Sequence, residues 1–413
     1  MPRSGGAAIL MRISLDKTVL DRVTYLTGSA EIAEKLPSTP ARQPFDDPIV
    51  DFLNDVSRAL MKDSRSKDYS DIVTFAFWIR KASVLKLKER FMNKDGVFLG
   101  KGVAFHIAPS NVPVNFAYSL VSGLLMGNAN VVRVPTKDFP QVIILADAFN
   151  QVLEQQNEMK PYVLCVRYGR DKEINDLFSS VADVRIVWGG NRTIEELRKS
   201  PLPPRSGEIS FADRYSLAVI DSDSYMEIEN KAGVAQDFYN DTFFSDQNAC
   251  TSPRLVVWMG NRIEEAKEVF WAEEHKLAMR KYSFRPIQGV NKLTKGYLIA
   301  ATEPGVKVEK HIDNLIVRVK IPQITDYLMD YRDNSGYFYE YDCQNILDLV
   351  PLCDDKRCQT IGYVGDKNVV LPLLKKGVKG IDRVVPIGKT MDFDLIWDGY
   401  NLPALLTRMV VLA

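Results

Sequence analysis

Residues 96–138 read GVFLGKGVAFHIAPSNVPVNFAYSLVSGLLMGNANVVRVPTKD, and this stretch decides the fold. Residues 103–107 form an apolar, β-rich run, and the Pro- and Asn-bearing segment 109–113 that follows suits a loop. We predict an apolar helix over 114–126, ended by the Gly-Asn pair after it, and a second strand over 131–134. The stretch is therefore typical of a strand–loop–helix–strand unit in an α/β protein.

The same alternation continues downstream. Helical periodicity covers 141–155 and 172–180, while apolar, strand-like runs cover 162–168 and 184–188. Strands that alternate with helices at this spacing predict a doubly wound, mainly parallel sheet. Ligands of such sheets bind outside the carboxyl ends of the strands.

Three polar loops fall at that predicted edge, namely residues 108–111, 133–136 and 189–192. They bear Gly or Pro, and a nucleotide would suit them. The third loop lies within WGGNRTIEELR (188–198), where a glycine turn before a helix lets backbone amides approach a phosphate. An ordinary strand-to-helix turn would have the same sequence, so this motif alone leaves phosphate binding open.

A second landmark is FFSDQNACTSPR, residues 243–254. Cys250 follows a short polar run and precedes the apolar, β-branched run 255–258, which predicts a buried strand. A thiol at the end of a helix or loop, beside small polar groups that lower its pKa, can act as a nucleophile. The alternative interpretation is a cysteine packed as a small hydrophobic side chain.

Composition argues against several classes of protein. Lys and Arg total 53 and Asp and Glu total 53 in 413 residues, without the basic excess that a nucleic-acid or membrane-surface partner usually leaves. No run reaches the ~18 apolar residues of a membrane span, and the N-terminus lacks a signal-peptide pattern, so we expect a cytoplasmic protein. The cysteines have no paired spacing, which predicts reduced thiols and no metal site. They are Cys165, Cys250, Cys343, Cys353 and Cys358.

Three segments resemble the aldehyde dehydrogenase superfamily in chain order. PSNVPVNFAYSLVSGLLMGNANVVRVP (109–135) is similar to its Asn loop, apolar helix and GNA-strand-Lys segment. VADVRIVWGGNRTIEEL (181–197) resembles its strand and Gly turn at the nucleotide, and FFSDQNACTSPR resembles its cysteine segment. PSNVPVNF, DQNACTSPR and DFDLIWDGY (392–400) resemble more closely the LuxC-type acyl-CoA reductases, the fatty-acid reductases known from bacterial bioluminescence operons. The resemblance covers about residues 95–400 and implies an α/β, aldehyde dehydrogenase-like fold.

The resemblance implies roles for individual residues. Cys250 would take an acyl group as a thioester, and the Asn111 amide with the Cys250 N–H would form the oxyanion hole, where one donor is worth roughly 3–4 kcal/mol. Arg133 stands where the family usually has a Lys that contacts the cofactor. Because Arg suits a bidentate grip on a 2′-phosphate, NADPH is favoured, with NADH left open. The other implied cofactor-binding residues are Ser110, Thr136, Gly189, Gly190, Asn191 and, within a residue or two, Glu340 as the glutamate that holds the nicotinamide ribose.

Two departures from the family pattern bear on the chemistry. Hydrolytic members carry a general-base Glu in an ELGG segment, and this chain has Phe211 at that place, in SFADRYSLAVIDSD. Without a base to activate water, a thioester on Cys250 should survive to receive hydride or exchange with a thiol. Glu195 replaces the second Gly of the cofactor turn, which puts the position of the phosphates in doubt.

These features favour NADPH-dependent reduction of a fatty acyl-CoA, or of an acyl-protein thioester, to the aldehyde. The donor would be acyl-CoA, or an acyl-carrier or acyl-transfer partner protein. Two alternatives stay open, an aldehyde-oxidising NAD(P)-dependent dehydrogenase and a catalytically inactive binding subunit of the same fold.

We expect a helical N-terminal region with a Rossmann-type NAD(P)-binding domain over 1–235, an α/β catalytic domain over 236–390, and a tail over 391–413. The apolar end of the chain, 407–413, should pair with a sheet edge of its own chain or of a partner, which indicates a homo-oligomer. The further helices expected are 51–60, 72–91 and 263–282. The further strands expected are 297–301, 306–308, 314–319, 346–352, 360–364 and 384–387.

Overall fold

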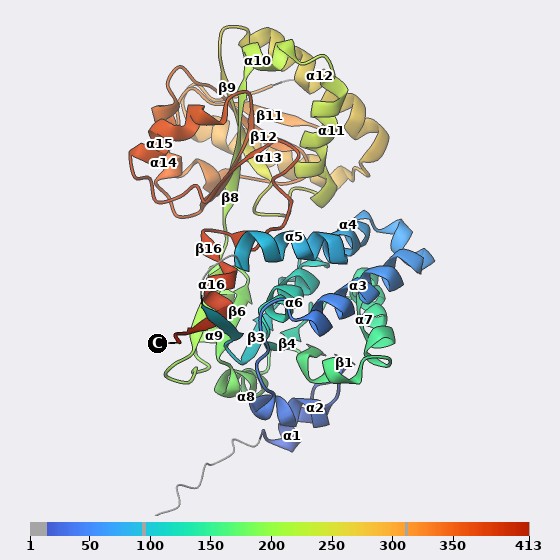
Figure 1. The fold of residues 1–413 in the computed structure, drawn as a ribbon. Helices are drawn as coiled ribbons and strands as arrows, with labels where there is room; N and C mark the ends of the chain where they lie inside the picture. The colour runs from blue at the N-terminus through green and yellow to red at the C-terminus, as the bar shows by residue number, and fades with distance from the viewer. Residues whose placement is uncertain (1–14, 93–95, 310–312, 413) are drawn as a thin grey trace, which may run out of the picture. The chain divides into compact units, whose positions relative to one another are not determined.

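A computed structural model describes residues 15–92, 96–309 and 313–412 of the chain. The chain forms two compact units (Figure 1), the first comprising Met1–Ala212 with Tyr400–Ala413 and the second Asp213–Gly399. This division differs from the predicted domain limits, because the boundary falls after Ala212 rather than after residue 235 and the last residues belong to the first unit.

The first unit is built on a six-stranded sheet in the order β1-β5-β4-β3-β6-β7. All neighbouring strands are parallel except β1, which pairs antiparallel with β5. From central β3 the chain runs outward through β4 and β5 and then returns to β6 and β7 on the other side, as a doubly wound sheet does. The predicted parallel sheet is thereby confirmed. The strands are β1 (Thr24–Thr27), β3 (Val103–Ile107), β4 (Ala129–Arg133), β5 (Val163–Arg167), β6 (Val184–Trp188) and β7 (Gly207–Phe211).

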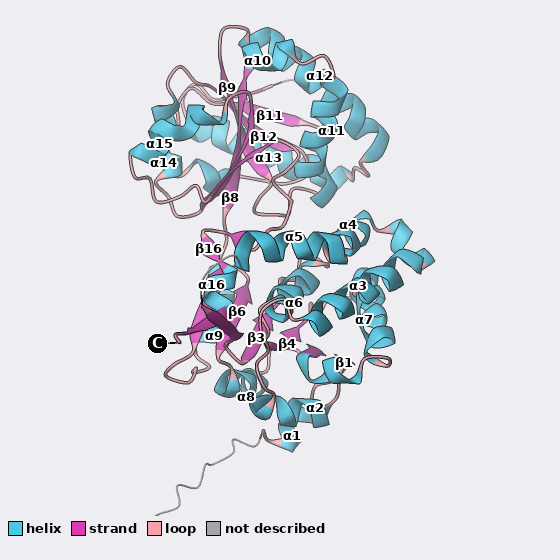
Figure 2. Cartoon of the chain, in the orientation of Figure 1, coloured by secondary structure: helices cyan, strands magenta, loops and turns pink. Residues whose placement is uncertain are grey.

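Helices cover both faces of this sheet (Figure 2), which explains why its central strands are almost continuously apolar and buried. The helix α6 ends where the Gly-Asn pair predicted, because Gly127 adopts φ 78° and its N–H bonds to the Leu124 carbonyl at 2.8 Å. The helices of the first unit are α1 (Lys17–Leu20), α2 (Ala30–Lys35), α3 (Asp47–Lys62), α4 (Ser70–Trp78), α5 (Lys81–Met92), α6 (Asn115–Leu125), α7 (Pro140–Leu153), α8 (Lys172–Val181), α9 (Asn191–Arg198) and α16 (Leu402–Leu406).

The single helix predicted over 72–91 is two helices, α4 and α5. Two hydrogen bonds mark the break between α4 and α5. The Lys81 N–H donates to the Asn54 side chain at 3.1 Å, and the Ser83 hydroxyl donates to the Phe77 carbonyl at 3.0 Å. These bonds replace the regular helical hydrogen bonds at the break.

The second unit is built on a seven-stranded sheet in the order β10-β11-β12-β9-β8-β13-β14, parallel except for β10. Successive residues of β8 pack into different cores, Leu217 and Val219 on one face and Ala218 and Ile220 on the other. Its strands are β8 (Tyr215–Asp221), β9 (Pro253–Met259), β10 (Lys307–Val308), β11 (Val317–Lys320), β12 (Tyr337–Asp342), β13 (Cys358–Val364), β14 (Arg383–Pro386) and the short β15 (Ile396–Trp397). Its helices are α10 (Ser222–Glu227), α11 (Lys231–Asp241), α12 (Ile263–Lys281), α13 (Pro286–Thr302), α14 (Val350–Cys353) and α15 (Leu371–Lys375).

Two predicted strands of the second unit are wrong. Residues 297–301 belong to α13, where buried Gly296 and Ile299 alternate at helical spacing with exposed Tyr297 and Leu298. Residues 346–352 form a 3₁₀ turn and α14, because the Asn345 side chain caps the turn at the Leu347 N–H, 3.0 Å away. Short apolar runs do not by themselves separate a strand from a buried helix.

The end of the chain pairs with a strand of its own first unit. β17 (Thr407–Val410) lies antiparallel to β2 (Val97–Gly100), after the short β16 (Tyr400–Asn401). The expected sheet-edge pairing is therefore intramolecular, and the homo-oligomer stays a prediction. No helix in the described ranges combines the length and the hydropathy that crossing a bilayer requires.

Asn128 joins this end of the chain to the start of β4. The side chain is buried, accepts the Gly102 N–H at 3.1 Å and donates to the carbonyls of Gly123 at 3.2 Å and Leu406 at 3.0 Å. We expect Asn128→Ala to lower the free energy of unfolding by about 2–4 kcal/mol, because it leaves buried backbone groups without partners. Urea unfolding measures this, and a loss no larger than that of Asn157→Ala, an exposed control, would contradict it.

Candidate functional site

Cys250 lies in the second unit, just before β9, at the amino-terminal edge of the parallel sheet. β9 pairs in parallel with β8, and β8 with β13, so the amino ends of the three strands meet there. Arg214 directly precedes β8, and Gln359 is the second residue of β13. The sheet therefore brings residues far apart in the sequence around Cys250.

The loop that carries Cys250 is fixed mainly by Gln247. This side chain is fully buried, accepts the Gly336 N–H at 2.7 Å, and donates to the carbonyls of Pro253 and Tyr337, both at 3.2 Å. The Ser216 hydroxyl also donates to the Cys250 carbonyl at 2.8 Å. The sequence showed Gln247 only as part of a polar run and gave no sign of Ser216, so their role in holding the loop was missed.

The backbone of the loop departs from ordinary geometry. Asp246 and Gln247 both have positive φ, at 52° and 50°. Such left-handed residues persist only where their surroundings hold them, and they concentrate at functional sites. The adjoining Arg254 helps to fix this backbone, because its guanidinium donates to the Asp333 carbonyl at 2.7 Å and to the Gln247 carbonyl.

The electrostatics of the Cys250 thiol differ from the prediction. We expected polar neighbours to lower its pKa, but burial raises the pKa to about 12, and the Asp398 charge raises it further against the smaller opposing effects of Arg214 and Gln359. A partly buried thiol with few donors favours its neutral form. Asp398 was missed as a site residue, since DFDLIWDGY served only as a family resemblance.

The first unit gathers the other predicted residues at one edge of its sheet. Ser110 and Asn111 follow β3, Arg133 ends β4 with Thr136 after it, and the segment 189–191 follows β6. Because β4, β3 and β6 are adjacent and parallel, the carboxyl ends of all three meet at this edge. Ser110, Asn111, Thr136, Gly190 and Asn191 are all exposed there.

This edge fits a dinucleotide. Gly190 caps the N-terminus of α9, and a Cβ added to it would meet nothing within 4 Å, so a ligand can approach the backbone. Glu195 lies farther along α9 and is exposed. The Arg133 guanidinium donates to the Gly169 carbonyl at 2.8 Å and packs over the Tyr168 ring at 4.7 Å, which holds its cation beside the same edge.

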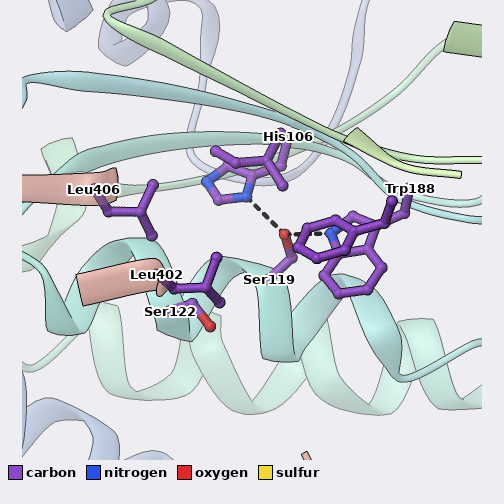
Figure 3. Close-up of a pocket in the computed structure, with 8 residues that line it drawn as sticks. His106, Ser119, Ser122, Trp188, Leu402 and Leu406 are labelled. Atoms are coloured by element: carbon purple, nitrogen blue, oxygen red, sulfur yellow. Dashed lines mark hydrogen bonds between the residues drawn. The ribbon is translucent and has the colours of Figure 1, made fainter. Parts of the chain in front are cut away.

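A buried polar network lies beneath this edge (Figure 3). The Ser119 hydroxyl bonds to His106 Nδ1 at 2.7 Å and accepts the Trp188 indole N–H at 2.9 Å. The cavity beside them, about 10 Å³, is no larger than a single water, so it is not the cofactor site. Burial lowers the pKa of His106 to about 4, which keeps the ring neutral.

Phe211 ends β7 and stacks on Trp188, with 3.6 Å between ring centroids. Only 5% of its surface is exposed. The place where hydrolytic relatives are expected to carry a base is thus an apolar stack.

Glu340 is not placed as the resemblance implied. Its carboxylate, 1% exposed on β12, accepts the indole N–H groups of Trp258 at 2.9 Å and Trp271 at 2.6 Å, and pairs with Arg318 at 3.3 Å. These contacts give it an internal, structural role in the second unit rather than a ribose contact. Within the described ranges, no cluster of His, Cys, Asp or Glu could hold a metal ion.

We expect Glu340→Ala to lower the free energy of unfolding by about 3–5 kcal/mol, because it removes the carboxylate that accepts two buried indole N–H groups and pairs with Arg318. Glu340→Gln, which keeps the shape and an acceptor oxygen, should cost less. Denaturant unfolding of both variants measures this. Undiminished stability of Glu340→Ala would contradict the structural role.

A family model and several curated proteins are similar to this chain in sequence. Residues 83–283 match the family model "Acyl-CoA reductase (LuxC)". A long-chain acyl-protein thioester reductase of Vibrio harveyi is 24% identical over 265 residues, which are 59% of this chain and 54% of that protein. One of Aliivibrio fischeri is 25% identical over 295 residues, 70% of this chain and 58% of that protein. The chain thus spans little more than half the length of these relatives.

Solved structures share the fold. A variant of 1-pyrroline-5-carboxylate dehydrogenase from Thermus thermophilus superposes with a TM-score of 0.63 at 12% identity, covering 93% of this chain and 85% of that one. An NAD-dependent benzaldehyde dehydrogenase from Corynebacterium glutamicum gives 0.61 at 14% identity, with 94% of each chain covered. The chain therefore has the aldehyde dehydrogenase fold, and its residues 83–283 match the LuxC family of acyl-CoA reductases.

Proposed function

We propose that this protein reduces a long-chain acyl thioester to the aldehyde with NADPH, through a thioester on Cys250. The observation that carries the proposal is the apolar Phe211–Trp188 stack at the position of the hydrolytic base. Phe211 cannot activate water, which favours reduction of an acyl group on Cys250 over its hydrolysis. The family match and the names of the relatives support the same reaction.

Cys250 and Asn111 have separate roles in the proposed reaction. The Cys250 thiol gives up its proton to solvent as the sulfur attacks the acyl carbonyl, the tetrahedral intermediate collapses, and the donor thiolate leaves and takes a proton. Asn111 and the Cys250 N–H stabilise the oxyanion. When bound, the cofactor supplies the hydride that reduces the thioester carbonyl. Collapse of the resulting thiohemiacetal releases the aldehyde and returns Cys250 as thiolate.

The cofactor would lie along the exposed edge of the first unit. Ser110, Thr136 and the turn 189–191 would line it, with the phosphates near the N-terminus of α9. Arg133 would bind the 2′-phosphate, which favours NADPH over NADH. One structural relative is described with bound NAD, which supports a dinucleotide on this fold.

The acyl donor would be CoA or a partner protein. The two relatives are named as reductases of acyl-protein thioesters, which supports a protein donor. The five free thiols suit a reducing compartment, and we place the reaction in the cytoplasm.

Intact-mass analysis after mixing with a panel of acyl-CoAs tests the nucleophile. We expect one acyl adduct on the wild type and none on Cys250→Ala, because the thioester needs that sulfur. Cys343→Ala, which removes a buried thiol, should still form the adduct. An adduct on Cys250→Ala would overturn the proposal, and so would its absence from the wild type with both acyl-CoAs and acylated carrier protein.

Substitution of Arg133 tests the cofactor. Arg133→Gln should lower kcat/KM for NADPH by about tenfold to a hundredfold, because a charge-assisted bond to phosphate is worth about 1.5–3 kcal/mol. The value for NADH should change little, and Arg58→Gln, an exposed control on α3, should leave both unchanged. Equal losses with the two cofactors would contradict 2′-phosphate binding by Arg133.

A further inference from the structure

Asp398 is a buried carboxylate in the second unit whose surroundings converge on Cys250. It is 7% exposed and has φ 50°, a left-handed conformation uncommon outside Gly. The Gln359 amide donates to it, and the Arg214 guanidinium lies 3.9 Å from it. These contacts hold the carboxylate in one position.

The same Gln359 side chain also interacts with the Cys250 thiol. The backbone supports this proximity, because the Ser216 hydroxyl donates to the Cys250 carbonyl at 2.8 Å and accepts the N–H of Thr360, the neighbour of Gln359, at 3.3 Å. Gln359 is fully buried, so its bond to Asp398 lies in a region that water screens poorly.

We infer that Asp398, held by Gln359 and Arg214 near Cys250, is a positioning residue that adds to burial in opposing ionisation of the Cys250 thiol and so lowers its reactivity in the free protein. The inference rests on the proposed role of Cys250 as nucleophile. A carboxylate nearby opposes a thiolate through charge repulsion, but it does not oppose a neutral thiol or a neutral thioester. Asp398 would thus protect the sulfur from alkylation and oxidation without destabilising the acyl-enzyme.

The other charged groups do not cancel this effect. Arg214 faces both Cys250 and Asp398, but it also pairs with Asp382 and donates to the Cys358 carbonyl at 3.0 Å. Arg254 faces Cys250 and Arg383 faces Asp398, while Asp382 adds negative charge. Burial raises the pKa of Asp398 to about 6, so it is mostly ionised at pH 7.5 and mostly protonated at pH 5.

The test follows alkylation of Cys250 by iodoacetamide in the full chain without substrate, with mass spectrometry locating the label. Asp398→Asn keeps the size of the side chain, and Asn tolerates left-handed backbone. It should react faster at pH 7.5, by about 3- to 4-fold for each unit by which the thiol pKa falls. The ratio of variant to wild type should fall towards one as the pH drops below 6, where the wild-type carboxylate also loses its charge.

Asp382→Asn is the matched control, because it makes the same substitution on another partner of Arg214. We expect wild-type rates from it. Equal rates for Asp398→Asn and wild type at pH 7.5 would overturn the inference. So would an acceleration that persists at pH 5, which indicates a loosened loop, or an equal acceleration in Asp382→Asn.

These measurements use no acyl donor, so they are separate from the test of the proposed function. If Asp398→Asn is alkylated faster but the wild type forms no acyl adduct, the proposed reaction is wrong and the effect of Asp398 on the thiol stands. If the wild type forms the acyl adduct but Asp398→Asn is alkylated at the wild-type rate, the proposed reaction stands and the effect of Asp398 is wrong.

Discussion

The hydrogen bonds of the Gln247 amide are the constraint on which the candidate nucleophile depends. One buried side chain joins the loop before Cys250 to Pro253 at the start of β9 and to the segment before β12. Such a bond contributes only about 1 kcal/mol net, but each group left unpaired in the interior costs more. The loop is therefore fixed more by the cost of breaking the network than by the strength of any one bond.

The two sheets present their polar residues at opposite ends of their strands. In the first unit, Ser110, Arg133 and Gly190 lie at the carboxyl ends of parallel strands, the usual place for a ligand, beside the N-terminus of α9. In the second, Cys250, Arg214 and Gln359 lie at the amino ends of β9, β8 and β13. A rule based on parallel sheets alone would find the edge with Ser110 and Arg133 and miss the edge with Cys250.

Burial opposes ionisation of both acidic groups at the Cys250 site. It raises the pKa of Cys250 to about 12 and that of Asp398 to about 6, because the interior opposes charge on both groups. Glu340 is buried as well, but two indoles and Arg318 satisfy its carboxylate. A buried carboxylate thus completes core hydrogen bonds at Glu340, whereas at Asp398 we propose that it opposes ionisation of the Cys250 thiol.

The sequence by itself determined the doubly wound sheet and the edge at which Ser110, Asn111 and Arg133 meet. Apolar periodicity and the Gly-Asn stop after α6 are local signals, and parallel strands place their carboxyl ends together whatever the details. It also singled out Cys250, and the family resemblance placed Phe211 where hydrolytic relatives are expected to carry a base. Only the tertiary structure decided that 297–301 is helical, that Glu340 is internal, and that Gln359 and Asp398 approach Cys250. The tertiary structure also decided that β17 pairs with β2 of the same chain. The reason is that burial and charge depend on neighbours from about twenty to more than a hundred residues away, which no local pattern specifies.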